Sequence, residues 1–412
     1  MTAHSPTTGR RAWLRVAAVM FGVGWGANQF ASLIVAYHQV RGLTVGTDEA
    51  LFGIYAVGLV PALLIGGPVS DRWGRARVVR PAALVSVVAT VVLLAGSHSV
   101  ALLSVGRFLA GAVSGAVFAA GTAWVKELSV PPFDEAAGEQ AGARRAAVAL
   151  SLGFGLGPLV AGVLAQWAPA PLVVPYLPHL VVMAVVIPGL WRAPETVTVS
   201  GAAAGGIWER LRVPSAAHPR FLRVVVPVAP WVFAAASVSF AVLPTVISAR
   251  TTGYGIAFAG LVAGVTLGVG VAVQPLARRL DRADDARGAS VGLAAVVVGL
   301  GLAALAAHLG SPALVLVTAA VLGAGYGCCL VAGLLEVQRL AGPDDLAGLT
   351  AVFYALTYVG FAVPVVIAEL HHVAGYPELL GALAVLAAAC AVLVGVQVRR
   401  GATAPGSRGG SQ

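Results

Sequence analysis

Residues 67 to 79 read Gly67-Pro-Val-Ser-Asp71-Arg72-Trp-Gly74-Arg75-Ala-Arg77-Val-Val, a short charged stretch between two long apolar runs. The runs on either side, residues 50–69 and 79–97, are about 20 residues long, which is the length an α-helix needs to cross a lipid bilayer. Arginine and glycine gathered in a tight turn between two such runs are typical of a polytopic membrane protein. We therefore interpret residues 67–79 as a turn that joins two transmembrane helices.

The composition of the whole chain supports a membrane protein. Of its 412 residues, 58% are hydrophobic and only 10% are charged, whereas soluble domains carry about 25% charged residues. A membrane barrel would need alternating ten-residue segments, and the sequence has none, so the backbone must satisfy its hydrogen bonds within helices. We predict an all-α membrane protein with twelve transmembrane helices. The predicted spans are residues 13–37, 50–69, 79–97, 100–128, 143–167, 171–191, 223–249, 255–277, 288–308, 312–340, 346–369 and 377–398.

Basic residues are distributed unevenly between the two sides of this topology. All but three of the 26 basic residues lie in segments that face the cytoplasm if the N-terminus is inside, and the exceptions are Arg41, Arg107 and Arg250. This asymmetry follows the positive-inside rule and predicts that both termini are cytoplasmic. The net charge of +9 is then a consequence of topology, and it gives no support to a nucleic-acid partner. Because arginine outnumbers lysine strongly and Ala, Gly and Val are abundant, as in GC-rich genomes, we expect a bacterial inner membrane.

The two halves of the chain repeat one another. Residues match at shifts of 206 or 212 positions, and the matched pairs include Trp25 with Trp231, Pro158 with Pro364, Gly111 with Gly323 and Gly115 with Gly327. The repeat predicts two pseudo-symmetric six-helix bundles with a substrate site near the midplane of the membrane. The expected parts are an N-terminal bundle (1–191), a cytoplasmic linker (192–222), a C-terminal bundle (223–400) and a disordered tail (401–412).

The charged turn also resembles a motif of the major facilitator superfamily. The loop between helices 2 and 3 in that superfamily has a pattern that is met here at Gly67, Asp71, Arg72, Gly74 and Arg75. The resemblance implies a transporter fold of twelve helices in two bundles. It also implies that Asp71 pairs with Arg75, accepts hydrogen bonds from a helix N-terminus, and closes the cytoplasmic side as an inner latch, with Gly67 and Gly74 permitting a close turn.

The expected partner of this latch departs from the usual pattern. The predicted helix 11 is preceded by Asp344 and Asp345, so carboxylates already occupy the helix N-terminus that Asp71 would approach. We therefore expect Arg72, Arg75 and Arg77 to meet these two aspartates when the latch closes.

A second resemblance lies in the predicted helix 5. The spacing of Gly153, Gly157, Pro158 and Gly162 is similar to a signature of the drug/proton antiporters in the superfamily, with Ala161 in place of one closing glycine. Proline removes a backbone hydrogen bond and glycine allows close approach, so this element is expected to act as a pivot. The resemblance implies export. A simple kink with close packing is the alternative.

Arg107 is the basic residue predicted to lie deepest within a membrane-spanning helix. It lies some seven residues into helix 4, roughly 10 Å below the outer surface. A cation at that depth is costly unless it faces a cavity or a partner, so we predict a role in substrate binding and coupling. The spacing from Leu103 to Arg107 and Gly111 resembles a helix 4 motif whose arginine is linked to coupling. For Arg107 the alternatives are a bond to a structural acid or a side chain that extends to the interface. Glu49 is the carboxylate we expect to carry the proton, and the alternatives are facilitated diffusion or a coupling step through Asp71.

Polar and aromatic residues mark the expected substrate site. Trp25, Asn28 and Gln29 share one face of helix 1 near its midpoint, and the repeat maps the two amides onto Ala234 and Ala235. Two adjacent amides in an apolar helix need partners, which a cavity or an interhelical hydrogen bond would provide.

The C-terminal half offers aromatic residues instead. Tyr354, Thr357, Tyr358 and Phe361 share one face of helix 11, and Tyr326 lies near the middle of helix 10. Rings that carry hydroxyl groups suit an amphipathic organic solute, although such stripes are also common in helix packing.

These features predict a monomeric secondary transporter that needs no cofactor or metal. We expect proton-coupled efflux, including multidrug efflux, of a small amphipathic solute by alternating access. Uptake or facilitated diffusion of a metabolite is the main alternative, and a receptor or assembly factor on the same fold is a remote one. An enzyme is not expected, because His179 stands alone and the pair His371 and His372 has no further metal-ligand spacing.

Overall fold

The computed structural model describes residues 12–138, 141–197, 213–280, 287–342 and 346–402, and these form helices without a strand. Within this part of the chain, 11 helices are long and apolar enough to cross a membrane, and the shorter apolar helix Val174–Leu190 joins them. The shorter helix coincides with the predicted sixth span. Each of the twelve predicted spans therefore has a helical counterpart, and the prediction of an all-α membrane fold is confirmed.

The chain divides into two compact units. Unit 1 comprises Met1–Arg210 with Thr251–Gly264, and unit 2 comprises Leu211–Arg250 with Val265–Gln412. The elements of unit 1 are α1 (Ala12–Asn28), α2 (Phe30–Arg41), α3 (Val45–Trp73), α4 (Arg75–Ala95), η1 (Gly96–His98), α5 (Val100–Glu127), α6 (Ala141–Trp167), η2 (Val174–Tyr176), α7 (Leu177–Leu190) and the first part of α10 (Gly255–Ala272).

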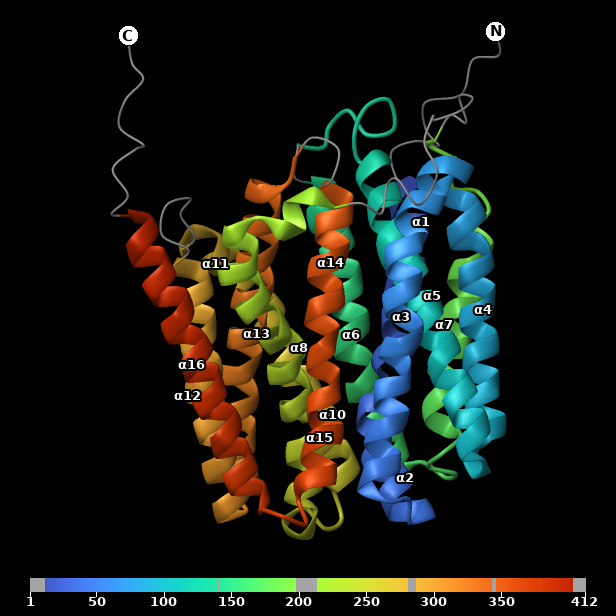
Figure 1. Cartoon of the computed structure of the whole chain (residues 1–412). Helices are drawn as coiled ribbons and strands as arrows, with labels where there is room; N and C mark the ends of the chain where they lie inside the picture. The colour runs from blue at the N-terminus through green and yellow to red at the C-terminus, as the bar shows by residue number, and fades with distance from the viewer. Residues whose placement is uncertain (1–11, 139–140, 198–212, 281–286, 343–345, 403–412) are drawn as a thin grey trace, which may run out of the picture. The chain divides into compact units, whose positions relative to one another are not determined.

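Unit 2 contains the remaining elements, and α12 and α16 lie side by side within it (Figure 1). They are η3 (Pro214–Ala217), η4 (Phe221–Val225), α8 (Val226–Ser237), η5 (Val238–Val242), α9 (Leu243–Val246), η6 (Ser248–Arg250), the rest of α10, α11 (Gln274–Leu280), α12 (Arg287–Leu309), α13 (Pro312–Leu340), α14 (Leu346–Tyr358), η7 (Val359–Phe361), α15 (Ala362–Leu370) and α16 (Tyr376–Ala402).

The start of α10 groups with unit 1 because it is bound to α6. The Gln166 side chain accepts hydrogen bonds from the backbone N–H groups of Ile256 (2.9 Å) and Ala257 (3.3 Å) and donates to the carbonyl of Gly253 (3.0 Å). One amide thus satisfies orphan donors at the N-terminus of α10. The expected C-terminal bundle, residues 223–400, therefore contributes a segment to unit 1.

Glycines bring α5 against α3 in unit 1. A Cβ atom at Gly111 would collide with the carbonyl oxygen of Tyr55, and one at Gly115 would collide with that of Leu59. Small residues spaced four apart allow this backbone approach, which is how helices pack tightly in lipid.

The matching glycines of unit 2 also allow two helices to pack closely. Gly323 and Gly327 of α13 lie against the carbonyls of Thr266 and Gly270 in α10, so a side chain at either position would collide with the backbone. The contacts therefore repeat in the two halves, as the sequence shift of 212 positions predicts.

Several membrane-spanning helices in the described part of the chain depart from regular α-helix within their length. The first is interrupted at Gln29, between α1 and α2; another passes through the π-helical segment η5; and the span from α14 to α15 contains the 3₁₀ segment η7. Local departures from α-helix free backbone groups and are often found at functional sites. The interruption at Gln29 and that at η7 coincide with predicted substrate residues.

Candidate transport site

The polar face of α1 is buried and incompletely hydrogen-bonded. Gln29 is 0% exposed and Trp25 is 7% exposed. Among the residues that the structure describes, neither amide atom of Gln29 nor the indole Nε1 of Trp25 has a hydrogen-bond partner. Asn28, the third predicted residue of this face, is only half-buried. Buried polar groups are rarely left unpaired, so Trp25 and Gln29 meet the usual criterion for a ligand or water site.

The predicted pivot of α6 packs directly against this part of α1. A Cβ atom at Gly153 would lie 2.9 Å from the backbone nitrogen of Trp25, and one at Gly157 would lie 2.7 Å from its carbonyl oxygen. The helix continues unbroken from Ala141 to Trp167 through Pro158. The two glycines therefore let α6 contact α1 at the residue that carries the unpaired indole.

Arg107 joins three helices of unit 1. It is 1% exposed, and it donates hydrogen bonds to the carbonyls of Leu51 in α3 (3.1 Å) and Ala27 in α1 (3.2 Å). Its guanidinium carbon also lies 4.6 Å from the ring centre of Phe30 and 4.7 Å from that of Tyr55. Carbonyl dipoles and aromatic faces both stabilise a buried cation.

The expected proton carrier lies close to this arginine in the sequence of α3. Glu49 is two residues from Leu51, whose carbonyl binds Arg107, but the side chain of Glu49 lies outside the described part of the structure. Its predicted role in coupling stays a prediction.

Aromatic rings gather around Phe233 of α8 in unit 2. The centre of the Phe233 ring lies 4.6 Å from that of Tyr358 and 4.7 Å from that of Phe361, and both pairs are stacked. Tyr326 of α13 stacks on the same ring at 6.0 Å. We call Phe233, Tyr326, Tyr358 and Phe361 the aromatic group of unit 2. Tyr326 and Tyr358 are predicted substrate residues and Phe361 shares the predicted face of helix 11, whereas Phe233 was missed because it stands alone among apolar residues in the sequence.

Two other predicted residues of this region lie differently. The Thr357 side chain is buried, and its hydroxyl donates to the carbonyl of Tyr354 at 2.7 Å. Tyr354 pairs with Phe353, with ring centres 5.7 Å apart, and has no stacking contact with Phe233. Within the described structure, the Thr357 hydroxyl proton is thus already used inside its own helix.

The charged turn is much tighter than the sequence suggests. Residues 67–73 continue α3 as helix, and only Gly74 is non-helical before α4 begins at Arg75. Gly74 has φ = +105°, which residues with a side chain rarely adopt, and a Cβ atom there would lie 2.6 Å from a carboxylate oxygen of Glu195. Gly67 lies inside the helix, where a Cβ atom would have a nearest neighbour 4.0 Å away. The expectation that Gly67 forms part of the turn is therefore wrong, because the turn is a single residue.

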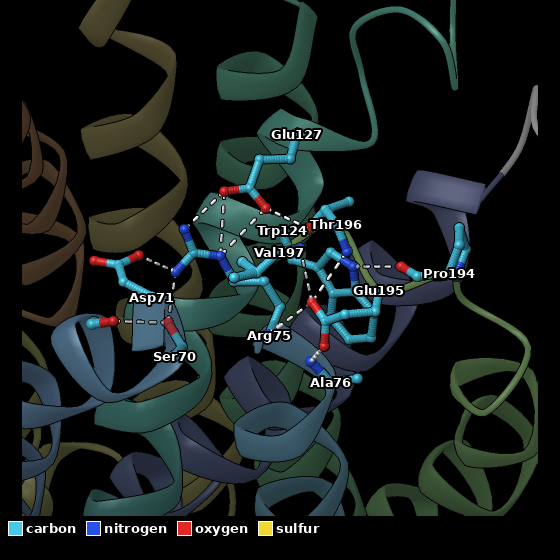
Figure 2. A network of polar contacts seen from close by, with 11 residues as sticks. Ser70, Asp71, Arg75, Ala76, Trp124, Glu127, Pro194, Glu195, Thr196 and Val197 are labelled. Atoms are coloured by element: carbon cyan, nitrogen blue, oxygen red, sulfur yellow. Dashed lines mark hydrogen bonds and ion pairs between the residues drawn. The ribbon is translucent and has the colours of Figure 1, made fainter. Parts of the chain in front are cut away.

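Glu195 caps the first turn of α4. Its carboxylate accepts hydrogen bonds from the backbone N–H groups of Arg75 and Ala76, both at 2.9 Å (Figure 2). The neighbouring Pro194 carbonyl accepts from the indole of Trp124 at 2.9 Å. A carboxylate at a helix N-terminus is favoured by the helix dipole, so this segment holds α4 and α5 in place.

Arg75 is the centre of a cluster of charges in unit 1. It is 7% exposed, forms an ion pair with Asp71, and donates to Glu127 from Nη2 (2.7 Å) and to the hydroxyl of Ser70 (2.6 Å) (Figure 2). Thr196 in turn donates to Glu127. We call Ser70, Asp71, Arg75 and Glu127 the Arg75 cluster. The predicted pairing of Asp71 with Arg75 is confirmed.

The other expected contacts of the latch remain predictions. Arg72 and Arg77 are exposed, and Asp344 and Asp345 lie outside the described residues. Every contact of Arg75 given above lies within unit 1. Glu127 and Glu195 were missed as partners because they follow long apolar helices and no local pattern connects them to Arg75.

Unit 2 contains a second charge cluster, in which the buried central residue is a carboxylate and not a cation. Glu336 is 1% exposed and accepts two hydrogen bonds from Arg220 (2.7 and 2.8 Å) and one from Arg339 (2.8 Å). Glu336 and Arg339 lie three residues apart, one turn of the same helix α13. We call these three residues the Glu336 cluster.

Comparison with known proteins identifies the family. The profile of the Major Facilitator Superfamily matches residues 14–363. The chain belongs to the major facilitator superfamily. A search of curated protein sequences finds no match.

Solved structures of similar fold include transporters of peptides and of nucleosides. A mutant of the peptide transporter POT is 14% identical with a TM-score of 0.79, and the alignment covers 95% of each chain. A POT family transporter in complex with 5-aminolevulinic acid is 13% identical (TM-score 0.77; 95% of this chain, 97% of that one). A mutant of the nucleoside transporter NupG is 10% identical (TM-score 0.73; 95% and 99%). At these identities the likeness is one of fold, and this member of the superfamily is a multi-pass membrane transport protein.

Proposed function

We propose that this major facilitator protein is a proton-coupled exporter of a small, amphipathic organic solute. It works as a monomer by alternating access in a bacterial inner membrane, with both termini in the cytoplasm. The distribution of arginines supports this orientation.

The contact between α6 and α1 carries the proposal. Gly153 and Gly157, part of the signature that resembles drug/proton antiporters, lie against the backbone of Trp25. Trp25 and Gln29 present buried polar atoms without partners. A change in the packing of α6 would therefore move the helix that binds the solute, which is what a transporter that couples binding to a conformational change requires.

The proposed substrate contacts differ between the two units. In unit 1, Trp25, Asn28 and Gln29 supply hydrogen-bonding groups. In unit 2, Tyr326 and Tyr358 supply stacking surfaces. An amphipathic solute with one polar edge and one apolar face matches these two kinds of surface.

Coupling is proposed to depend on Arg107 and Glu49. Arg107 binds the backbone of α3 two residues beyond Glu49, so protonation of that carboxylate would alter the electrostatic environment of the buried cation. A change at Arg107 would also reach α1 through Ala27. This gives a route from proton binding to the helix that carries Gln29.

The Arg75 cluster is proposed to control the cytoplasmic side. Its arginine holds α3, α4 and α5 together, so Asp71 and the exposed Arg72 and Arg77 are presented in a fixed geometry. Closure would add contacts from these exposed groups without disturbing the buried pair.

Inverted membrane vesicles from cells that make the protein test this function. A panel of aromatic carboxamides, nucleosides, dipeptides, sugars and organic cations is added outside, and the lumen is acidified by respiration. We expect accumulation of at least one amphipathic compound that a protonophore abolishes. Accumulation only in right-side-out vesicles would establish uptake instead, and equilibration that ignores the protonophore would establish facilitated diffusion.

Substitution at two adjacent carboxylates tests the coupling step in the same vesicles. Glu49→Gln is expected to abolish accumulation against a gradient while exchange of solute across the membrane continues. Asp48→Asn, which removes the neighbouring charge, is the matched control and should accumulate solute normally. Equal behaviour of the two variants would remove Glu49 from the coupling step.

A further inference from the structure

Three polar atoms on one face of α1 have no hydrogen-bond partner in the described structure. They are Nε1 of Trp25 and both Nε2 and Oε1 of Gln29. The backbone N–H of Gln29 donates to the carbonyl of Trp25 at 2.9 Å, so the two side chains stand one helical turn apart on the same face. The site therefore offers two donors and one acceptor close together.

The backbone that carries this pair is held firmly. Gly153 and Gly157 of α6 lie against Trp25, and Phe21 makes an edge contact with the Trp25 ring at 5.8 Å between ring centres. The buried cation Arg107 donates to the carbonyls of Ala27 and Leu51. The donors and the acceptor of the pair are thus neutral groups on a fixed helix.

The arrangement selects one kind of chemical group. A glutamine amide pairs in a cyclic fashion with another group that has an acceptor beside a donor, and the indole N–H can donate to the second lone pair of that acceptor. A carboxylate would face Oε1 with its own negative oxygens, and an ammonium group would face two N–H donors. Each of these would leave buried polar atoms unpaired, which costs binding free energy.

We propose that Trp25 and Gln29 form a subsite for an uncharged amide-type group of the substrate that has its donor beside its acceptor, such as a primary carboxamide or a lactam. This deepens the proposed transport function and rests on it for the identification of the ligand as substrate. The subsite belongs to unit 1 alone, because the repeat places Trp231 and Ala235 at the corresponding positions of α8.

Stability without ligand gives a first test. An unpaired buried amide destabilises the protein, so Gln29→Met, which keeps the length of the side chain, should leave the melting temperature unchanged or raise it. A clear fall in melting temperature would mean that the amide is already hydrogen-bonded in the resting protein, and it would overturn the proposal.

Binding of three matched probes gives the second test. Benzamide, N,N-dimethylbenzamide and benzoate share one ring and differ in the group offered to Gln29. Purified protein in lipid nanodiscs is titrated with each probe and binding is followed by ligand-observed NMR. We expect benzamide to bind at least about tenfold more tightly than the other two probes. The loss of one hydrogen bond in a buried site lowers the affinity by about that factor.

The variants sharpen this result. Gln29→Met should remove the preference for benzamide, and Trp25→Phe should weaken benzamide a few-fold because the indole N–H is lost together with its pyrrole ring. Trp231→Phe is the matched control and should change nothing. Absence of benzamide binding, equal binding of the three probes, or a preference that survives Gln29→Met would each overturn the amide subsite.

The two proposals fail separately. Loss of vesicle accumulation with the benzamide preference intact would count against transport and leave the subsite in place. Transport of panel compounds that shows no benzamide preference would overturn the subsite and leave transport in place.

Discussion

The two units share a way of packing helices but differ in what they bury. In unit 1, Gly111 brings α5 against α3, and in unit 2, Gly323 brings α13 against α10 at the corresponding positions. The shift that aligns these glycines aligns Arg107 with Ala319, and Gln29 corresponds to Ala235. Small residues at helix contacts are thus kept in both halves, whereas the buried Arg107 and Gln29 of unit 1 have alanine counterparts in unit 2. The positions of the repeat that determine helix packing are therefore different from the positions that carry the buried polar side chains.

The charge clusters of the two units also differ in what they bury. The Arg75 cluster buries a cation between carboxylates, and the Glu336 cluster buries a carboxylate between two arginines. Each cluster leaves its outer members partly exposed, where water reduces the cost of their charge. Removal of a carboxylate therefore affects the Arg75 cluster, and removal of an arginine affects the Glu336 cluster. Mutations can test the contribution of each cluster to stability separately.

The largest difference between the units is expected at Arg107. Arg107→Lys keeps the positive charge but has one donor nitrogen, whereas Arg107 donates to Leu51 from Nε and to Ala27 from Nη1. We expect transport to fall at least about tenfold while the protein still inserts and elutes as a monodisperse peak, since one lost charge-assisted hydrogen bond is worth about 1.5–3 kcal/mol.

The counterpart in unit 2 provides the control for that substitution. Ala319→Ser adds a hydroxyl that can donate to its own helix, and it should retain transport within a few-fold. Near-normal transport by Arg107→Lys would show that the charge alone suffices and that the two units differ less than their buried groups suggest.

The Glu336 cluster should give the largest loss of stability. In the double variant Arg220→Met with Arg339→Met, the carboxylate of Glu336 stays buried without these cations, and breaking such pairs costs about 3–5 kcal/mol. Each single variant should cost less, because the other arginine remains. SDS-induced unfolding in mixed micelles measures the free energy of unfolding.

A third substitution isolates the buried charge as the cause. Adding Glu336→Met to the double variant should restore most of the lost stability, because no charge is then left in the apolar interior. In unit 1, Asp71→Asn removes only a partly exposed carboxylate and should cost about 1 kcal/mol or less. A triple variant as unstable as the double would refute this account.

The single-residue turn of unit 1 should be next in magnitude. Gly74→Ala forces a side chain into a left-handed conformation, which costs about 1–3 kcal/mol, and places its Cβ atom against Glu195. Gly67→Ala, seven residues earlier in the same motif, places a Cβ atom 4.0 Å from its nearest neighbour inside a helix and should be neutral or slightly stabilising. Removing the carboxylate with Glu195→Ala should relieve only the steric part of the Gly74→Ala loss. Equal melting temperatures for the two glycine variants would contradict the observed turn.

The twelve-helix fold could be predicted from the sequence because length and apolarity alone decide which segments span a membrane. The glycine contacts also followed, since a repeated small residue at a spacing of four has few other uses in lipid. The turn was misjudged at Gly67 because the sequence motif extends over a helix end that only the structure locates.

The candidate site could be predicted only where polar residues interrupt apolar helices. Gln29 and Arg107 were found in this way, because an isolated polar group in a membrane needs a reason. Phe233 and Glu195 could not be found, since one is an ordinary apolar residue in an apolar helix and the other follows a helix far along the chain. Their roles come from neighbours that are distant in sequence, and a single sequence carries no signal for such pairs.

The smallest effect is expected in the aromatic group of unit 2. Phe233→Leu removes the ring that stacks on Tyr358, Phe361 and Tyr326, and such pairs are worth about 0.5–1.5 kcal/mol beyond the area they bury. If this group stacks on the substrate, the variant should bind benzamide a few-fold less tightly and cyclohexanecarboxamide nearly as before. The ratio of benzamide to N,N-dimethylbenzamide binding should stay unchanged, because that ratio depends on Gln29 in unit 1.

Phe353→Leu makes the same substitution at a buried ring that pairs with Tyr354, and it should alter stability without altering the preference for an aromatic probe. If Phe233→Leu lowers the affinity for both probes equally, the aromatic group only packs α8, α13 and α14 together. The proposal that unit 1 supplies polar contacts and unit 2 aromatic contacts would then be wrong.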